Sequence, residues 1–319
     1  IGKILKPIRH LFPPLVTGIV VLMIGVSLLK VGFMYAGGGG WLMNNKPEIF
    51  GNSNHLIIAG TVLIVSLVLN IKGKGMVSSA SILLGMVAGY VVAMAFGMVN
   101  YGKIAAAGWF AFPMPLQYGI DFVPGAIILM LFMSIVTTIE TIGDISATTM
   151  GGDNREATNK ELSGGIMADG VGTAFGALFN AMPNTSYSQN AGLVAFTGVI
   201  SRHVGTIAGI ILVLMGLFPK LGGVIAAMPE SVIGGAAIIM FGLIASAGIK
   251  LISRAEMNQT NLLILGLSLS FGIGMSLLPQ FVAHIPDFGI SFKLLLTTGL
   301  IPAGIIAFVL NATLSKKKR

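Results

Sequence analysis

Ten apolar segments run through this chain, each long enough to cross a lipid bilayer or nearly so. In lipid, an isolated segment satisfies its backbone hydrogen bonds only as a helix, so the pattern predicts an all-α polytopic membrane protein. Composition agrees, since 9% of the residues are charged and a soluble domain carries roughly a quarter. The ten predicted spans are 13–36, 54–71, 76–98, 121–143, 164–181, 187–201, 204–219, 229–249, 259–278 and 292–312.

In this ten-span arrangement, the positively charged residues are distributed unevenly between the two sides of the membrane. Fourteen of the 19 Lys and Arg residues fall on one side, which the positive-inside rule makes cytoplasmic. An even number of spans places both ends of this chain on that side of the cell membrane. The net charge of +8 therefore reflects topology, and it does not indicate a nucleic-acid partner. The fourteen residues are Lys3, Lys6, Arg9, Lys72, Lys74, Arg155, Lys160, Arg202, Lys250, Arg254, Lys316, Lys317, Lys318 and Arg319.

The sixth span is short and follows a poor helix-forming stretch at 183–187. Pro183 lacks a backbone donor, and Asn184, Thr185 and Ser186 offer the backbone competing hydrogen bonds. Non-helical backbone at membrane depth is tolerated where it is buried in protein or lines a wet cavity. A broken or strand-like segment here is typical of a substrate site in a secondary transporter.

Three acids fall in or near the apolar segments. Glu140 and Asp144 are four residues apart and share one helix face, and Asp169 lies in the Gly-rich fifth span. A charge inside a membrane costs at least ~2.5–3.5 kcal/mol, so it normally faces a cavity or a partner. Two carboxylates one turn apart favour sharing a proton, which suggests proton coupling. For Asp144 and Asp169, backbone hydrogen bonding or helix capping near the loop is an open alternative.

Gln189 and Asn190 follow the broken segment, with Tyr187 just before them. A carboxamide can hold a planar amide-containing ligand by two hydrogen bonds, and a tyrosine can stack on a flat ring. Interhelical hydrogen bonding and ordinary aromatic packing are the alternatives for these residues.

An enzyme is not expected. The chain has no Cys, and its four His residues fall at predicted span ends or in loops, which makes a metal cluster improbable. We find no phosphate loop, zinc motif or nucleophile–base arrangement, so no cofactor is expected.

Several of these residues together resemble the signature of the nucleobase–ascorbate transporter family, also called nucleobase:cation symporter-2. Gln189-Asn190-x-Gly192-x4-Thr197 is the most specific part. The preceding Asn184-Thr-Ser-Tyr-Ser, the stretch Glu140-Thr-Ile-Gly-Asp144 and the acid Asp169 also resemble the family pattern, in the same order.

The resemblance implies fourteen helices in two inverted repeats of seven, of which the ten spans here resemble helices 5–14. The family's first four helices would then be missing from this chain. Residues 1–120 would form gate-domain helices, 121–220 core-domain helices with the substrate site, and 221–319 the last gate-domain helices with a basic cytoplasmic tail. A homodimer is implied by the family only.

The implied function is proton-coupled import of a purine by movement of the core against the gate. Glu140 and Gln189 resemble the family's substrate-binding residues, Ser188 would offer its backbone N–H, and Asn190, Asp144 and Asp169 match polar positions tied to function. Gln at 189 resembles the xanthine and uric acid branch, whereas uracil carriers tend to have Glu. A uracil permease of the same family, and an anion exchanger or channel of related fold, remain the alternatives.

Overall fold

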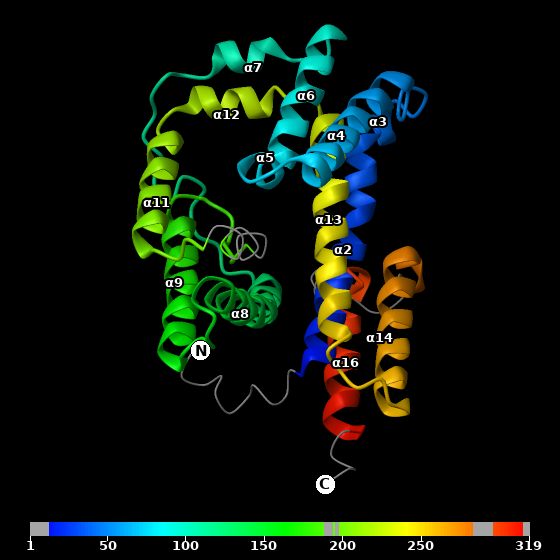
Figure 1. Ribbon diagram of the computed structural model, residues 1–319. Helices are drawn as coiled ribbons and strands as arrows, with labels where there is room; N and C mark the ends of the chain where they lie inside the picture. The colour runs from blue at the N-terminus through cyan, green and yellow to red at the C-terminus, as the bar shows by residue number, and fades with distance from the viewer. Residues whose placement is uncertain (1–12, 188–193, 195–197, 283–295, 315–319) are drawn as a thin grey trace.

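The computed structural model describes residues 13–187, 194, 198–282 and 296–314, and every regular element in them is a helix (Figure 1). The longer helices are α2 (Pro14–Ala36), α4 (Ser53–Lys72), α6 (Ser81–Ala95), α8 (Pro124–Asp153), α9 (Asn159–Leu178), α11 (Arg202–Gly216), α13 (Glu230–Ile252), α14 (Gln259–Leu277) and α16 (Leu300–Leu314). The shorter ones are α3 (Gly40–Asn45), α5 (Met76–Ser79), α7 (Tyr101–Ala106), α12 (Pro219–Ala226) and the 3₁₀ turn η2 (Pro279–Val282).

A polytopic membrane protein is confirmed, although the number of clear spans is smaller than the ten predicted. Five of the described helices, α2, α4, α8, α13 and α14, are long and apolar enough to cross a bilayer. A sixth results if α11 and α12, which meet at an 80° bend, count as one broken span. The helices α6 and α16 are apolar but shorter, with 15 residues each.

The predicted span 121–143 ended too early. Helix α8 continues through Asp144 to Asp153 and ends where Asn154 adopts a left-handed conformation with φ of 52°. Neither proline nor a left-handed residue interrupts the stretch before that point, and hydroxyls at Ser146 and Thr149 bond back to carbonyls of their own helix. As a result, Asp144 lies inside a continuous helix one turn beyond Glu140.

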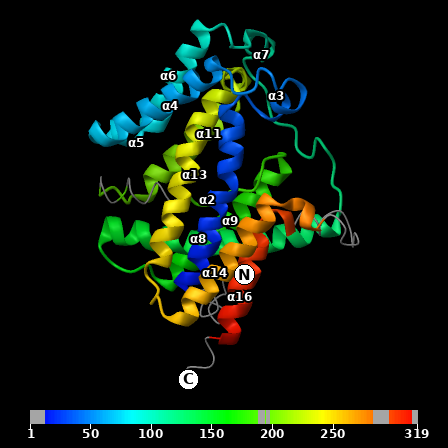
Figure 2. The same ribbon diagram turned by 90° about the vertical axis from the view of Figure 1, so that its right-hand side faces the viewer.

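The long helices form two sets separated from side to side in Figure 1. One set, here called the α8 group, contains α8, α9 and α11. The other, the α2 group, contains α2, α4, α6, α13, α14 and α16. Turned by 90°, the molecule shows α2 and α13 crossing in front as a close pair (Figure 2).

Helices α2 and α13 run antiparallel in a single register along the length of α2. Gly32 faces Ile238, Gly25 faces Ala245 and Gly18 faces Ile252, so that the contacts recur every seven residues on both helices. A methyl group added at Gly25 would overlap the backbone nitrogen of Ala245. The helices therefore approach backbone to backbone, as small residues allow in membranes.

Two antiparallel helices, α7 and α12, carry the chain between the α2 and α8 groups. Each offers a lysine to the C-terminal end of the other. Lys103 of α7 donates to the carbonyl of Ala226 at 3.1 Å, and Lys220 of α12 donates to that of Ala107 at 3.0 Å. A cation near a helix C-terminus is favourable for the helix dipole. Lys220 also lies 5.4 Å from the ring centroid of Trp109.

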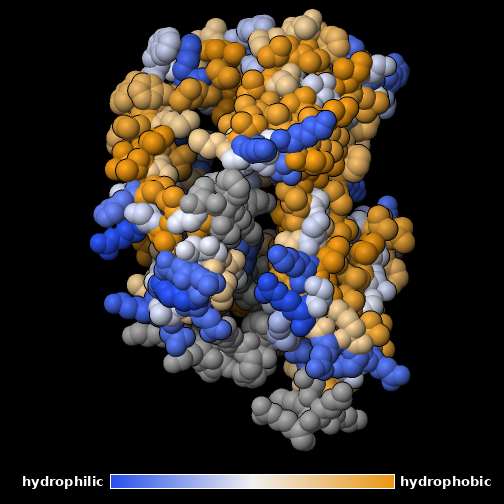
Figure 3. Space-filling model, in the orientation of Figure 1, coloured by the Kyte–Doolittle hydropathy of each residue, from blue (hydrophilic) through white to orange (hydrophobic). Residues whose placement is uncertain are grey.

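Much of the outer surface is apolar, as expected for helices that face lipid. Large side chains of α4 and α6 point outward, among them Ile64, Ile71 and Leu83, each more than 60% exposed. Figure 3 shows hydrophobic residues over most of the visible upper surface, and hydrophilic residues gathered in the lower half of that view.

Replacing Gly25 with Ala should lower the unfolding temperature of the purified protein in detergent. The new methyl forces α2 and α13 apart, and overpacking of this kind costs roughly 1–3 kcal/mol. Gly60→Ala on α4 is the matched control, because a methyl group there meets no atom within 4 Å. Both variants gain the same helix propensity, so equal unfolding temperatures would contradict the α2–α13 contact.

Candidate functional site

The chain folds back on α9 where the sequence predicted a broken segment. Helix α9 ends at Leu178, Asn180 takes a left-handed φ of 62°, and residues 181–187 form neither helix nor strand. Thr173 of α9 then binds the returning chain at Asn184. The hydroxyl oxygen of Thr173 lies 3.3 Å from both the backbone nitrogen and the backbone oxygen of Asn184. A non-helical segment therefore lies against a helix and takes part of its hydrogen bonding from that helix's side chains.

This segment meets the two carboxylates of α8 through consecutive hydroxyl residues. Thr185 directs its Oγ1 to Oε2 of Glu140 at 3.5 Å, and Ser186 donates from Oγ to Oδ2 of Asp144 at 2.6 Å. The Ser186 bond has the short length of a charge-assisted hydrogen bond, whereas the Thr185 contact lies at the limit of one.

The third acid, Asp169 of α9, is bound from two directions. The amide Nδ2 of Asn184 donates to its Oδ1 at 2.9 Å, and the hydroxyl of Thr141 donates to its Oδ2 at 3.3 Å. Thr141 is on α8 and is only 4% exposed. Its hydroxyl also lies 3.3 Å from that of Ser186, so the segment, α8 and α9 share one polar network.

Neutral groups alone donate to the three carboxylates within the part of the chain that the structure describes. The only ion pairs among the described residues join Arg155 to Asp153 and Glu161, in the loop after α8. No group of three or more His, Asp or Glu side chains in the same residues has the arrangement of a metal site. The site can therefore accept N–H groups of a ligand or protons, and no Lys or Arg of the described residues is paired with its carboxylates.

The structure brings together three of the residues that the sequence singled out, namely Glu140, Asp144 and Asp169. Tyr187 is the last described residue of the segment and is 49% exposed. The other predicted site residues, Ser188, Gln189 and Asn190, lie outside the described residues, so their predicted approach to Glu140 stays a prediction.

Several neutral residues of the network were not among the predicted site residues. Asn184, Thr185 and Ser186 were interpreted as helix breakers and as part of the family pattern, and Thr173 lies outside the predicted site. The useful signal is their type: three consecutive hydrogen-bond donors at membrane depth need acceptors, and the acids of α8 and α9 supply them. Thr137, which shares a helix face with Glu140, bonds instead to the carbonyl of Ser134.

The loop between α8 and α9 fixes the two helices at their aqueous ends. Thr158 and Glu161 form a capping box at the start of α9, and Arg155 donates from Nη2 to Oε1 of Glu161 at 2.6 Å. Further along, the side chain of Ile145 on α8 packs over Gly165 of α9 and fills the space where a methyl group would lie. This contact and the loop hold Asp169 near the α8 carboxylates.

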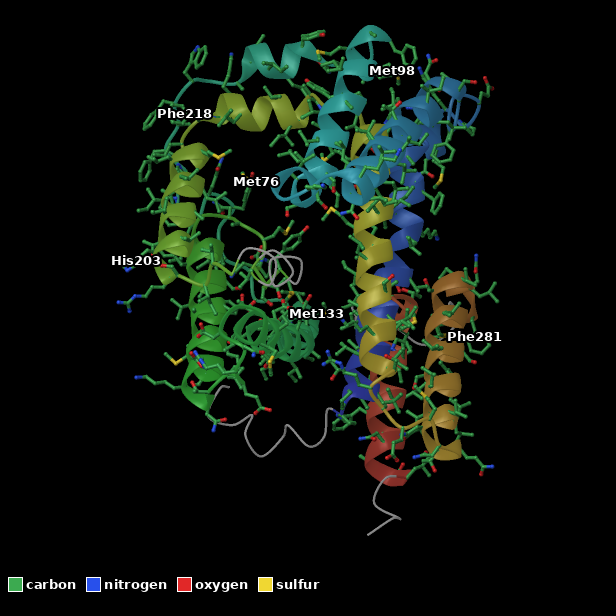
Figure 4. All side chains as sticks on the ribbon, viewed as in Figure 1. Met76, Met98, Met133, His203, Phe218 and Phe281 are labelled. Atoms are coloured by element: carbon green, nitrogen blue, oxygen red, sulfur yellow. The ribbon has the colours of Figure 1, made fainter. Side chains whose placement is uncertain are left out.

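The described histidines stand apart from the acids. His55 lies in the first turn of α4, where its Nδ1 is 2.5 Å from Oγ of buried Ser231. His203, at the start of α11, is directed away from the rest of the molecule (Figure 4). Both histidines lie in the first turn of a helix, in line with the prediction that they fall at span ends or in loops.

Comparison with known proteins reveals clear relatives. The profile described as Permease family matches residues 1–281. A putative purine permease of Clostridium perfringens is 38% identical over 98% of this chain and 67% of its own length. Xanthine permease XanP of Escherichia coli is 35% identical over 100% and 69%, and uric acid transporter UacT of the same species is 38% identical over 98% and 63%. The chain spans about two thirds of the length of these relatives.

The capping box predicts a pH dependence of stability. Hydrogen bonds from Arg155, and then from Thr158, hold the pKa of Glu161 below its ordinary value. A lowered pKa in the folded state gives stability that is present above the ordinary glutamate pKa and is lost as the pH falls below it. The unfolding temperature of the wild type should therefore exceed that of Glu161→Gln at pH 7, and the difference should shrink by pH 3.5.

The effect should be small because Arg155 and Glu161 are exposed to solvent. Glu156→Gln in the same loop is the control, since no hydrogen bond of the Glu156 carboxylate is recorded. A difference between wild type and Glu161→Gln that stays constant from pH 7 to pH 3.5 would contradict the predicted linkage.

Proposed function

Because this chain belongs to the nucleobase–ascorbate transporter family, we propose that it imports a purine nucleobase of the xanthine or uric acid type by proton symport. The family makes it a multi-pass membrane transporter and not an enzyme. The purine class rests on relatives whose names specify purine, xanthine or uric acid. The plasma membrane is the expected location.

The observation that carries the proposal is the network of Glu140, Asp144 and Asp169 around a non-helical segment. An oxopurine presents several ring N–H donors, and carboxylates supply the matching acceptors. In the proposal, Glu140 accepts ring N–H groups, and Gln189 pairs with the amide edge of the ring. Tyr187 stacks on the ring, and Ser188 and Asn190 complete the polar contacts.

The proton is the proposed coupling ion. Asp144 and Asp169 each already accept a hydrogen bond from a neutral donor, and neither is paired with a cation in the described residues. A carboxylate at membrane depth without a cation is stabilised by taking up a proton. Binding of ligand N–H groups at Glu140 would then be linked to protonation of the neighbouring acids.

The transport movement we propose is displacement of a core domain (121–220) against a gate domain (1–120 and 221–319). In its favour, the helices of the α8 group and of the α2 group gather on opposite sides of Figure 1, and the connecting helices α7 and α12 are bonded to each other. The ten-span topology with both ends in the cytoplasm, the two inverted repeats of seven helices and a homodimer belong to the same proposal.

An anion exchanger fits the site less well. Three carboxylates and no described cation near them would repel a free anion. The carboxylates alone would also accept the N–H groups of uracil. The Gln at residue 189, however, argues for a purine.

The proposal is tested by uptake of radiolabelled xanthine into cells that lack their own purine permeases and express this protein. We expect uptake that collapses when a protonophore abolishes the proton gradient and that excess unlabelled uric acid suppresses. Uptake that excess uracil suppresses more strongly than uric acid would favour the uracil carrier. Uptake indifferent to the gradient, or absent, would refute purine–proton symport.

Glu140→Gln should reduce xanthine uptake about ten- to a hundredfold at equal amounts of protein in the membrane. The change removes a charged acceptor that is needed in the transport cycle, and losing a hydrogen bond to a charged group costs about 1.5–3 kcal/mol. Glu156→Gln is the control, because this loop acid lies outside the network and should transport normally. Retained transport in Glu140→Gln would remove this residue from the site.

A further inference from the structure

We propose that Asn184 is a positioning residue, which seats the broken segment on α9 so that Thr185 and Ser186 reach the carboxylates of α8. This inference rests on the proposed function, because positioning matters there for ligand binding. The residue was not among the predicted binding or coupling groups.

Both ends of the Asn184 carboxamide are engaged. Its Nδ2 donates to Oδ1 of Asp169 at 2.9 Å, and its Oδ1 accepts from Oγ1 of Thr173 at 2.6 Å. Asp169 and Thr173 are four residues apart on α9 and therefore present one acceptor and one donor on the same face. An amide matches this pair in only one orientation, which fixes the side chain.

The backbone of Asn184 is held at the same place. The Thr173 hydroxyl lies 3.3 Å from both the backbone N and the backbone O of Asn184. One α9 side chain thus binds both the main chain and the side chain of this residue. No other residue of the described segment 183–187 has recorded hydrogen bonds of both kinds to α9.

The surface of α9 leaves room for the carboxamide. A methyl group added at Gly172 would lie 3.2 Å from Nδ2 of Asn184 and 3.4 Å from its Oδ1. That separation is tighter than an ordinary van der Waals contact, so a larger residue at 172 would push the amide outward. Gly172, Asp169 and Thr173 together form a seat for an asparagine side chain.

Other residue types lose part of this fit. Aspartate cannot donate to Asp169 and would place two carboxylates together. Leucine has nearly the same shape and makes neither bond. Serine is too short to reach both partners, and glutamine is longer by a methylene group over the space that Gly172 leaves.

The seat determines what the next two residues can reach. Thr185 and Ser186 directly follow Asn184 and contact Glu140 and Asp144 on α8. Since consecutive residues share a short backbone, a shift at Asn184 moves both hydroxyls away from their carboxylates. Asn184 therefore acts on a ligand at Glu140 through the register of the segment, without needing to touch the ligand.

The first experiment measures KM and kcat for xanthine uptake, with kcat normalised to protein in the membrane. Asn184→Leu and Thr173→Val should each raise KM about tenfold or more, as expected for the loss of a hydrogen bond that positions a binding group. Thr173→Ser keeps the hydroxyl and should restore a near-normal KM. Asn45→Leu is the matched control, because Asn45 bonds only to a carbonyl of its own helix α3.

A double-mutant cycle then tests whether the two residues act as one unit. The variant Asn184→Leu with Thr173→Val should have a KM close to that of either single variant, because each change already breaks the seat. The proposal would be overturned if the increase in KM of the double variant equalled the product of the increases in the two single variants, or if KM were unchanged in Asn184→Leu. A fall in the amount of protein or in kcat with KM unchanged would also overturn it, since that indicates a merely structural role.

A second measurement is independent of transport. The chain has no cysteine, so Met182→Cys with Val171→Cys accepts one spin label at each of two positions, both more than 60% exposed. We expect a narrow distance distribution between the labels, and a broad one after adding Asn184→Leu. An unchanged distribution would overturn the seat, whereas a broadened distribution in a protein that takes up no xanthine would refute only the proposed function.

Discussion

Three carboxylates at membrane depth must be satisfied by neutral donors, and this constraint organises the site. A carboxylate in lipid is costly unless a cation, a proton or hydrogen bonds compensate it. Here the compensation comes from an amide and three hydroxyls, of which Asn184, Thr185 and Ser186 are supplied by one non-helical stretch. A regular helix could not offer three consecutive side chains to acids on two helices, because neighbouring positions on a helix point in different directions. The break after α9 is therefore a requirement of the site and not an irregularity next to it.

The sequence alone predicted those helices whose ends coincide with a change from apolar residues to helix-ending or polar ones. Helices α2, α4, α13 and α14 start and end within about three residues of the expected spans, because apolar runs give way there to Pro, Asn, Gly or Lys. The break near Pro183 was expected for the same kind of reason. The predicted span 121–143 ended before Asp144, for which capping near the loop was an open alternative, whereas α8 continues to Asp153. Asp144 in fact finds its partner in the network, and Ser146 and Thr149 bond within the helix.

Contacts between segments could not be predicted in the same way. That Asn184 meets Asp169, or that Thr141 of α8 reaches an acid of α9, depends on how two helices are rotated and how the chain returns between them. A hydropathy pattern carries no such information. The acids themselves were predictable because a charge in an apolar run is conspicuous, whereas an asparagine or threonine beside them is common in many roles. The family resemblance included Asn184, Thr185 and Ser186 in its pattern but did not pair them with the acids.

The pairing of α2 with α13 also bears on how the protein is made. Helix α2 leaves the ribosome well before α13, because most of the described chain lies between them. Until then the glycine face at Gly18, Gly25 and Gly32 lies against lipid or a temporary neighbour, which cannot fit it as closely as its final partner. A contact between such distant parts of the chain forms late, because loop closure over a long separation must come first. Formation of this helix pair thus awaits synthesis of α13, and termination of translation before α13 would leave α2 without its packing partner.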